Sequence, residues 1–131
     1  MNFVSRFLNL YIKPLITWGG KAMTSNFTKA VVHHAEDMFA WRVPNADNQM
    51  HWVADLNVPT WGFIDEILED VYKRTNNING RWIDNDGIIS YKKPLEGRGH
   101  RSTSVGDTIA LHTEDGQYLY FRVASFGFDK I

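Results

Sequence analysis

The sequence predicts an α+β domain, a mostly antiparallel sheet of about five strands packed against one main helix. Three observations support this fold class. Short runs rich in β-branched and aromatic residues are separated by turn residues, as in antiparallel sheets. An Asp-Gly pair joins two alternating runs near the C-terminus, which is typical of a β-hairpin. One apolar stripe with helical spacing lies mid-chain.

The composition indicates one globular domain. A chain of 131 residues is long enough to bury a single core, and 44% hydrophobic with 14% aromatic residues excludes a disordered polymer. The net charge of −1 gives no general attraction to polyanions, so an electrostatic partner would need a local patch. Without cysteine the chain has no disulfide, thiol nucleophile or Cys-based zinc site, which fits a reducing cytosol.

Residues 1–22 read as a helical extension that precedes a single domain over 23–131. Their apolar residues recur at helical spacing, although Pro14 interrupts the run. The run is shorter than the ~18 apolar residues of a membrane span, and no cleavage site of a signal peptide follows it. Three interpretations stay open: a helix packed on the domain, an extension before a natural start at Met23, and a membrane-surface helix, which the few basic residues disfavour.

The first strands are expected in the N-terminal half. Residues 26–32 suit an extended segment. Residues 38–43 and 50–58 alternate and are separated by a turn cluster over 44–48, so we expect them to pair as a hairpin.

The main helix is predicted from Thr60 to Arg74, with the Thr60 hydroxyl as its N-cap. Acidic residues in its first turns and basic residues in its last turn suit the helix dipole, and we interpret them as a solvated face rather than as catalytic carboxylates. The apolar residues at helical spacing are expected to face the core: Ile64, Ile67, Leu68, Val71 and Tyr72.

The C-terminal part is predicted to be β-rich. Strands over 108–112 and 117–124 flank the turn Glu114-Asp115-Gly116. We expect the following bend, 125–128, to lay both of its phenylalanine rings on the core or on a neighbouring strand. Three further segments precede the hairpin: a short strand or helix exit at 81–83, a strand at 88–92 and a loop at 94–100.

A basic loop carries the first candidate binding residues. It lacks the pattern of a nucleotide-binding P-loop, so a solvated loop is favoured and a phosphate contact stays open. The hydroxyl residues after it have no nucleophile elbow around them, and we expect them to hydrogen-bond the loop and cap the next turn. The basic residues are Lys92, Lys93, Arg98, His100 and Arg101. The predicted binding residues are Arg98, His100, Arg101, Ser102, Ser104 and Asp107.

A metal site is not favoured. The segment 33–37, His-His-Ala-Glu-Asp, lacks the spacing of the helical two-histidine zinc motif, and an exposed polar loop or helix end is the preferred interpretation. No catalytic residue and no cofactor are predicted. Four tryptophans would be able to stack bases, but core or interface anchors are the commoner role: Trp41, Trp52, Trp61 and Trp82.

The run Arg101-Ser102-Thr103-Ser104-Val105-Gly106-Asp107, the hairpin after it and the terminal Gly127-Phe128 resemble small uncharacterised phage and plasmid proteins grouped as YodL-like. The helix segment 68–72, the segment 75–78 and the segment 82–87 resemble the upstream part of those proteins. The resemblance covers about residues 64–128 and carries no established activity. It implies a mobile-element accessory protein in a bacterial cytoplasm.

Three functions from different classes follow as hypotheses. The first is a non-catalytic accessory protein that binds a host macromolecule, most plausibly a protein, through an aromatic-rich surface and the loop 98–105. The second is a nucleic-acid-binding module that uses the basic loop 92–101. The third is a small hydrolase or transferase with a site near His100 and Asp107. Salt dependence separates the first two, because phosphate contacts weaken steeply with salt.

Overall fold

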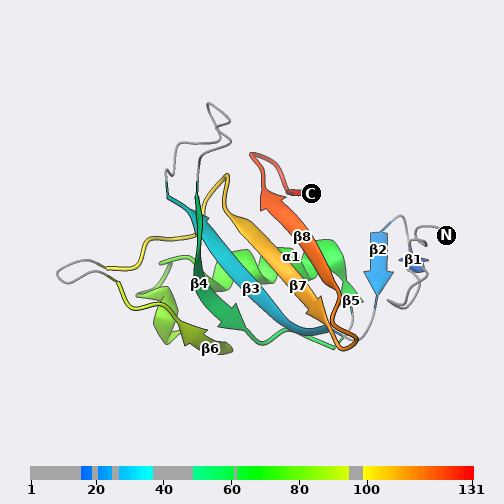
Figure 1. Ribbon diagram of the computed structural model, residues 1–131, viewed down its shortest axis with the longest axis horizontal. Coiled ribbons are helices and arrows are strands. Elements are labelled where there is room, and N and C mark those ends of the chain that lie inside the picture. The colour runs from blue at the N-terminus through cyan, green and yellow to red at the C-terminus, as the bar shows by residue number, and fades with distance from the viewer. Residues whose placement is uncertain (1–15, 19–20, 25–26, 37–48, 61, 95–98) are drawn as a thin grey trace.

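The computed structural model describes residues 16–18, 21–24, 27–36, 49–60, 62–94 and 99–131, which form two antiparallel sheets and one α-helix (Figure 1). The larger sheet has six strands in the order β6-β4-β3-β7-β8-β9. The α+β class is therefore confirmed, with one strand more than expected. Its strands are β3 (Phe27–Ala35), β4 (Met50–Leu56), β6 (Ile88–Tyr91), β7 (Thr108–Thr113), β8 (Tyr118–Val123) and β9 (Phe128–Lys130).

The smaller sheet changes the prediction for the N-terminal region. It contains β1 (Ile16–Trp18), β2 (Lys21–Thr24) and β5 (Gly62–Phe63), in the order β1-β2-β5. The described part of 1–22 is thus strand, not helix, and residues 1–15 lie outside the described residues. The expected boundary at 22/23 falls inside β2. This strand pairs with β5, where Met23 faces Phe63, just before the main helix begins.

The main helix, α1, runs from Ile64 to Arg74 and packs its apolar face on the larger sheet. Ile64, Ile67, Leu68 and Val71 are buried as predicted, and Tyr72 is partly buried against them. The N-cap prediction was wrong: the helix starts after Phe63, without a side-chain cap. The carbonyl oxygen of Thr60 instead accepts a hydrogen bond from Phe27 N at 2.6 Å, so it fixes the start of β3.

The strand predicted at 50–58 is confirmed as β4. Among the described strands, β4 pairs with β3 on one side and, along its C-terminal half, with β6 on the other. The hairpin predicted between 38–43 and this strand stays a prediction. Residues 38–43 and the turn 44–48 lie outside the described residues.

The C-terminal prediction was correct in its strands and half correct in its bend. β7 and β8 pair around the predicted turn, from Thr108 facing Arg122 to His112 facing Tyr118. In the bend after β8, Phe128 packs on the core and meets Tyr72 edge-on, at 6.4 Å between ring centroids. Phe126 points into solvent with 95% of its surface exposed, contrary to the prediction.

The remaining predicted segments lie between α1 and the C-terminal hairpin. A 3-10 helix, η1 (Trp82–Asp84), takes the place of the expected short strand or helix exit, and it buries Trp82 in the core. The predicted strand at 88–92 is β6. Residues 95–98 of the predicted loop lie outside the described residues.

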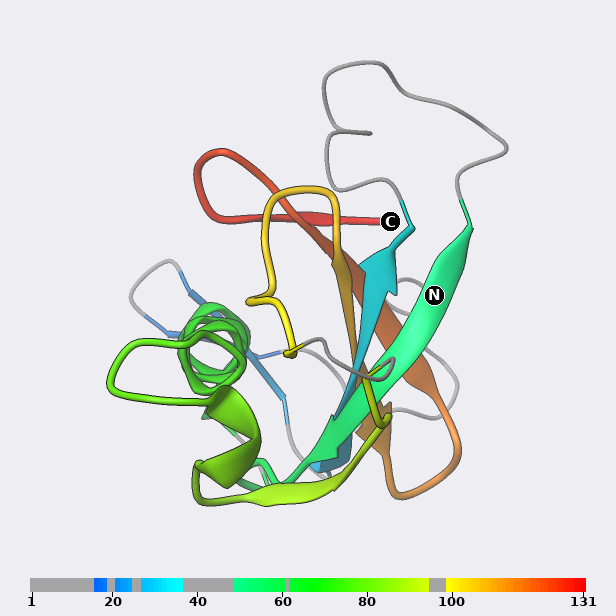
Figure 2. The same cartoon turned by 90° about the vertical axis from the view of Figure 1, so that its left-hand side faces the viewer.

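The helix covers only one face of the larger sheet. Figure 2 shows α1 and η1 on one side of the strands, and Figure 1 looks onto the opposite side. Alternate residues of β3, β7 and β8 face the helix and form the core, as a two-residue period requires. The strand residues that face α1 include Ala30, Val32, Ala54, Leu56, Ile109, Leu111, Leu119, Phe121 and Val123.

Candidate functional site

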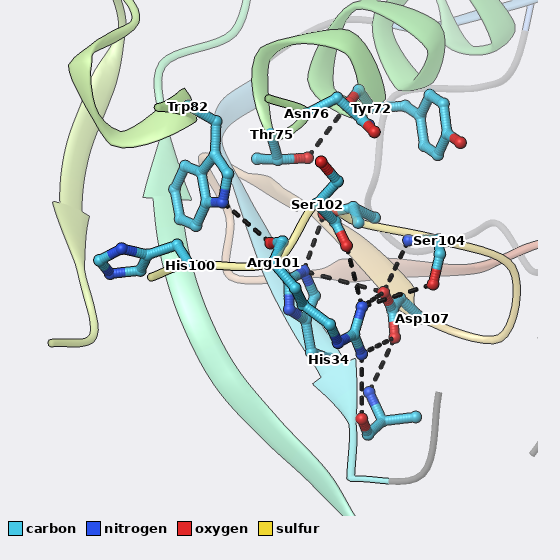
Figure 3. Close-up of polar contacts among 12 residues, drawn as sticks. His34, Tyr72, Thr75, Asn76, Trp82, His100, Arg101, Ser102, Ser104 and Asp107 are labelled. Carbon is cyan, nitrogen blue, oxygen red and sulfur yellow. Dashed lines mark hydrogen bonds and ion pairs between the residues drawn. The ribbon is translucent and has the colours of Figure 1, made fainter. Parts of the chain in front are cut away.

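The predicted run 101–107 folds back on itself around the carboxylate of Asp107 (Figure 3). Asp107 is fully buried, and its two oxygens accept four hydrogen bonds. Ala35 N donates to Oδ1 and Ser104 N to Oδ2, both at 2.8 Å. The Arg101 guanidinium donates to both oxygens, at 2.7 and 2.9 Å. This bidentate pairing satisfies a buried carboxylate that would otherwise be strongly unfavourable.

The same arginine ties the run to β3. Arg101 Nη2 also donates to the carbonyl oxygen of Ala35 at 3.0 Å. Asp107 accepts from the N–H of Ala35, the last residue of β3, and Arg101 donates to its C=O. We call this set, Arg101, Asp107, Ser104 and Ala35, the 101–107 clamp.

His34 lies beside the clamp in the core-facing row of β3. Its Nε2 shares a 2.8 Å hydrogen bond with Thr103 Oγ1 and lies 3.8 Å from Asp107 Oδ2. Burial lowers the pKa of His34 to about 4, against the smaller opposing effect of the Asp107 charge. His34 is thus neutral at pH 7. The expectation of an exposed polar loop at 33–37 was wrong for this residue, because it belongs to a strand.

The remaining polar groups of the run bind the end of α1 and the 3-10 helix. Ser102 Oγ accepts from Asn77 N at 2.8 Å, and Trp82 Nε1 donates to Arg101 O at 3.0 Å. His100 Nε2 bonds to Lys92 O, and its ring meets those of Trp82 and Tyr91 edge-on. Of the three hydroxyl groups, that of Ser104 bonds within the loop, accepting from Arg101 Nη1 at 3.4 Å, whereas those of Ser102 and Thr103 bond residues of other elements. The prediction that the hydroxyls cap the turn was wrong, because the Asp107 carboxylate accepts from Ser104 N there.

These contacts do not form a catalytic relay. A hydroxyl nucleophile needs a base on one imidazole nitrogen and an orienting acid on the other. Here Thr103 and Asp107 both face Nε2 of His34, and Thr103 is itself buried from solvent. His100 is bonded to a backbone carbonyl instead of to Asp107. The geometry favours a structural role for this set.

The predicted basic loop is not one surface. Lys92 and Lys93 are exposed, whereas Arg101 turns inward onto Asp107 and His100 packs among aromatic rings. Arg98 lies outside the described residues. Of the six predicted binding residues, the five that the structure describes form internal hydrogen bonds: His100, Arg101, Ser102, Ser104 and Asp107. Their role in binding a partner stays a prediction.

The structure reveals a different surface on the sheet face opposite α1. Tyr118 and Tyr120 of β8 point outward with 50% and 44% of their surfaces exposed, and Trp52 of β4 is exposed on the same face. The Tyr118 ring lies 4.2 Å from that of His112 and 6.0 Å from that of Tyr120. We call this surface the open face; it comprises Lys29, Val31, His33, Trp52, Asp55, Ala110, His112, Tyr118, Tyr120 and Arg122.

The residues in the middle of the open face are small and apolar. Val31 faces Ala110 across β3 and β7, and Ala110 faces Tyr120 across β7 and β8. Both residues are buried, with 7% and 3% of their surfaces exposed. The exposed part of this face therefore consists of the aromatic and polar side chains around them.

The charged side chains of the open face lie beside side chains of opposite charge. Asp55 accepts from Lys29 Nζ at 3.0 Å and from Trp52 Nε1 at 2.9 Å. Arg122 lies across from Asp129 in the pairing of β8 with β9. Partial burial lowers the pKa of His33 and of His112, so both rings are neutral at pH 7. The surface is aromatic and close to neutral.

The sequence of β8 carries a signal for this face. Buried and exposed residues alternate strictly along β8. The residues with odd numbers, Leu119, Phe121 and Val123, belong to the core. Two tyrosines and an arginine must then share the other face. Which further residues join them depends on strand order, which the sequence does not show.

Comparisons of the chain with protein-family models, with curated proteins and with solved structures found no match. Within the described ranges, no cluster of three or more His, Asp or Glu side chains is placed to hold a metal ion. The only α-helix of those ranges is too short and too polar to cross a bilayer.

Proposed function

We propose that this protein is a non-catalytic binding module and that another protein docks on its open face. The observation that carries the proposal is the pair of half-exposed tyrosines, Tyr118 and Tyr120, on a face that no described element covers. Tyrosine, tryptophan and arginine dominate the energetics of protein interfaces. The open face holds all three residue types.

Charge balance favours a protein over a nucleic acid as the partner. Surfaces that bind phosphate backbones carry an excess of Lys and Arg. On the open face, Lys29 is paired with Asp55 and both histidines are neutral at pH 7. Depletion of unpaired charge with enrichment of aromatic residues is the pattern of an interface core.

The proposal retains the aromatic surface of the first hypothesis but not its loop. The polar atoms of the 101–107 clamp are already used in internal hydrogen bonds, so a partner that engaged them would have to break these bonds. That the partner is a host protein and the chain a mobile-element accessory protein follows from the resemblance alone.

The experiment is an affinity capture from bacterial lysate with three tagged proteins. They are the wild type, the double variant Tyr118→Ala/Tyr120→Ala, and the control Ile78→Ala, which removes an exposed apolar side chain beyond the end of α1. Each capture is run with and without nuclease. Circular dichroism first establishes that all three have the same fold.

The proposal predicts a protein that the wild type and the control retain after nuclease treatment and that the double variant loses at least about tenfold. Equal retention by all three would exclude the open face as the docking site. Loss of every partner after nuclease, with recovery of nucleic acid, would favour the basic loop 92–101 instead.

A further inference from the structure

The connection between α1 and η1 is a small closed loop with Asn79-Gly80 at its tip. Trp82 N donates to Asn77 Oδ1 at 2.9 Å, and this hydrogen bond joins the two ends of the loop. Asn77 and Trp82 each donate a further hydrogen bond to a backbone carbonyl of the segment 100–101. The ends of the loop are therefore fixed, whereas the residues between them are exposed.

At the tip, two reactive groups are unengaged. Asn79 and Gly80 are both exposed, and neither has a hydrogen bond or an ion pair with another of the described residues. A Cβ added to Gly80 would meet no atom of the described residues within 4 Å. The side-chain amide of Asn79 and the backbone N–H of Gly80 can therefore approach each other.

Asn77, two residues earlier, is also exposed but is held by hydrogen bonds. Its side-chain N–H donates to His100 O at 2.8 Å, and its side-chain oxygen accepts from Trp82 N. The backbone N–H that follows it, Ile78 N, donates to Asn76 O at 3.0 Å. The two groups that are unengaged at Asn79-Gly80 are thus both engaged at Asn77-Ile78.

We propose that Asn79 deamidates spontaneously in the folded protein, with Gly80 N as the nucleophile and water as the only co-reactant. Hydroxide takes the proton of Gly80 N, which then bonds to Asn79 Cγ, and the bond from Cγ to the side-chain nitrogen breaks. Ammonia leaves with a proton from water. Glycine favours this ring closure, because it has no side chain that crowds its nitrogen.

Water then opens the cyclic imide at either of its two carbonyl carbons. Attack at Cγ gives aspartate, and attack at the main-chain carbonyl carbon gives isoaspartate, whose main chain runs through Cγ. The overall change consumes one water and releases one ammonia, and nothing is oxidised or reduced.

The product carries a new negative charge next to Arg81, which is exposed and paired with Asp84 at 3.2 Å. Isoaspartate also lengthens the backbone of the loop by one carbon atom. Because the ends of the loop are fixed and its tip has room, the modified chain keeps Trp82 in the core. The inference does not depend on the proposed function, since no residue of this loop belongs to the open face.

Mass spectrometry of the full chain tests the proposal, after incubation at pH 7 and at pH 9 in water labelled with heavy oxygen. Peptides are prepared by brief digestion in acid, where this base-catalysed reaction is slow. The same incubation is run on the chain unfolded in guanidinium chloride. It is also run on the variant Asn79→Gln, whose longer side chain would have to close a larger ring.

The proposal predicts labelled aspartate and isoaspartate at position 79, formed faster at pH 9 than at pH 7, while Asn77 stays unchanged in the folded chain. Because no hydrogen bond has to break at the tip, the folded and the unfolded chain should convert Asn79 at rates within about tenfold of each other. A folded chain that converts Asn79 more slowly than this overturns the proposal. Conversion of Asn77 as fast as that of Asn79 overturns it as well, as does an Asn79→Gln variant that gains negative charge as fast as the wild type in anion-exchange chromatography.

Discussion

Asp107 shows how one buried side chain fixes a loop against a distant strand. Its carboxylate gathers the backbone of Ala35, the backbone of Ser104 and the guanidinium of Arg101. Without it, the N–H groups of Ala35 and Ser104 would lose their acceptor and Arg101 would lose its ion-pair partner. Buried charges are tolerated where such partners are complete, and removing one partner is strongly destabilising.

The substitution Asp107→Asn should lower the free energy of unfolding by about 3 kcal/mol, because an amide keeps the volume but cannot accept from all four donors. Urea denaturation measures the loss. Asp129→Asn is the matched control, since Asp129 is exposed on β9, and its effect should stay within about 0.5 kcal/mol. Equal stabilities of the two variants would refute the structural role of the clamp.

His34 makes the stability of the fold depend on pH. Its pKa is lowered from 6.5 to about 4 in the folded chain, mainly by burial, so the unfolded chain binds the proton more readily. The stability that neutral His34 contributes is complete above pH 6.5 and is lost as pH falls toward 4. The loss amounts to about 3 kcal/mol if the whole difference in pKa is realised.

Urea denaturation at pH 7.5, 5.5 and 4.5 tests this dependence. The variant His34→Gln should be less stable at pH 7.5, because Thr103 loses its partner. It should then lose less stability than the wild type on acidification. Parallel pH profiles for the two proteins would show that His34 is not the responsible group.

At the scale of elements, two glycines with the same backbone conformation differ in their surroundings. Gly87 leads into β6 with φ 84°, and Gly116 sits in the turn between β7 and β8 with φ 87°. A Cβ on Gly116 would meet nothing, whereas a Cβ on Gly87 would collide with the Arg74 guanidinium. Arg74 donates there to Asn57 O at 2.7 Å, so it ties α1 to the end of β4.

We therefore expect Gly116→Ala to cost about 1 kcal/mol from backbone strain alone, and Gly87→Ala to cost at least about 1 kcal/mol more. Thermal unfolding of both variants measures the difference. If the two substitutions cost the same, the Arg74 contact contributes nothing.

The sequence predicted the elements that local pattern determines. The period of α1 identified its buried face, and alternation with an Asp-Gly turn identified β7 and β8. The position of β4 was also predicted, but its pairing with β3 was not, because nothing in a strand's own pattern names its neighbour. The prediction for Phe126 was wrong because a phenylalanine beside a turn usually packs inward, whereas this turn places it in solvent.

The residues of the candidate sites were likewise predictable only where the local sequence determines their contacts. The expectation that the hydroxyl residues of 101–107 bond their own loop holds for Ser104 but not for Ser102 and Thr103, which bond Asn77 and His34. The partners His34 and Ala35 come from β3, 69 and 72 residues away from Thr103 and Asp107. Contacts over such separations arise from sheet order, which also assembles the open face from β3, β4, β7 and β8.

At the scale of the molecule, one face of the sheet is closed by α1 and the other presents aromatic side chains to solvent (Figures 1 and 2). Stability and binding are therefore assigned to different surfaces. The clamp and the core hold the fold, while Tyr118, Tyr120 and Trp52 stay available.

The most direct test is the affinity of the nuclease-resistant partner, once purified, for the wild type and for Tyr120→Ala at low and at high salt. Isothermal titration calorimetry measures it. If the open face is the docking site, Tyr120→Ala binds at least about tenfold more weakly and the affinity changes little with salt, as for an aromatic interface. Unchanged affinity of the variant, or an affinity that falls steeply with salt, would contradict it.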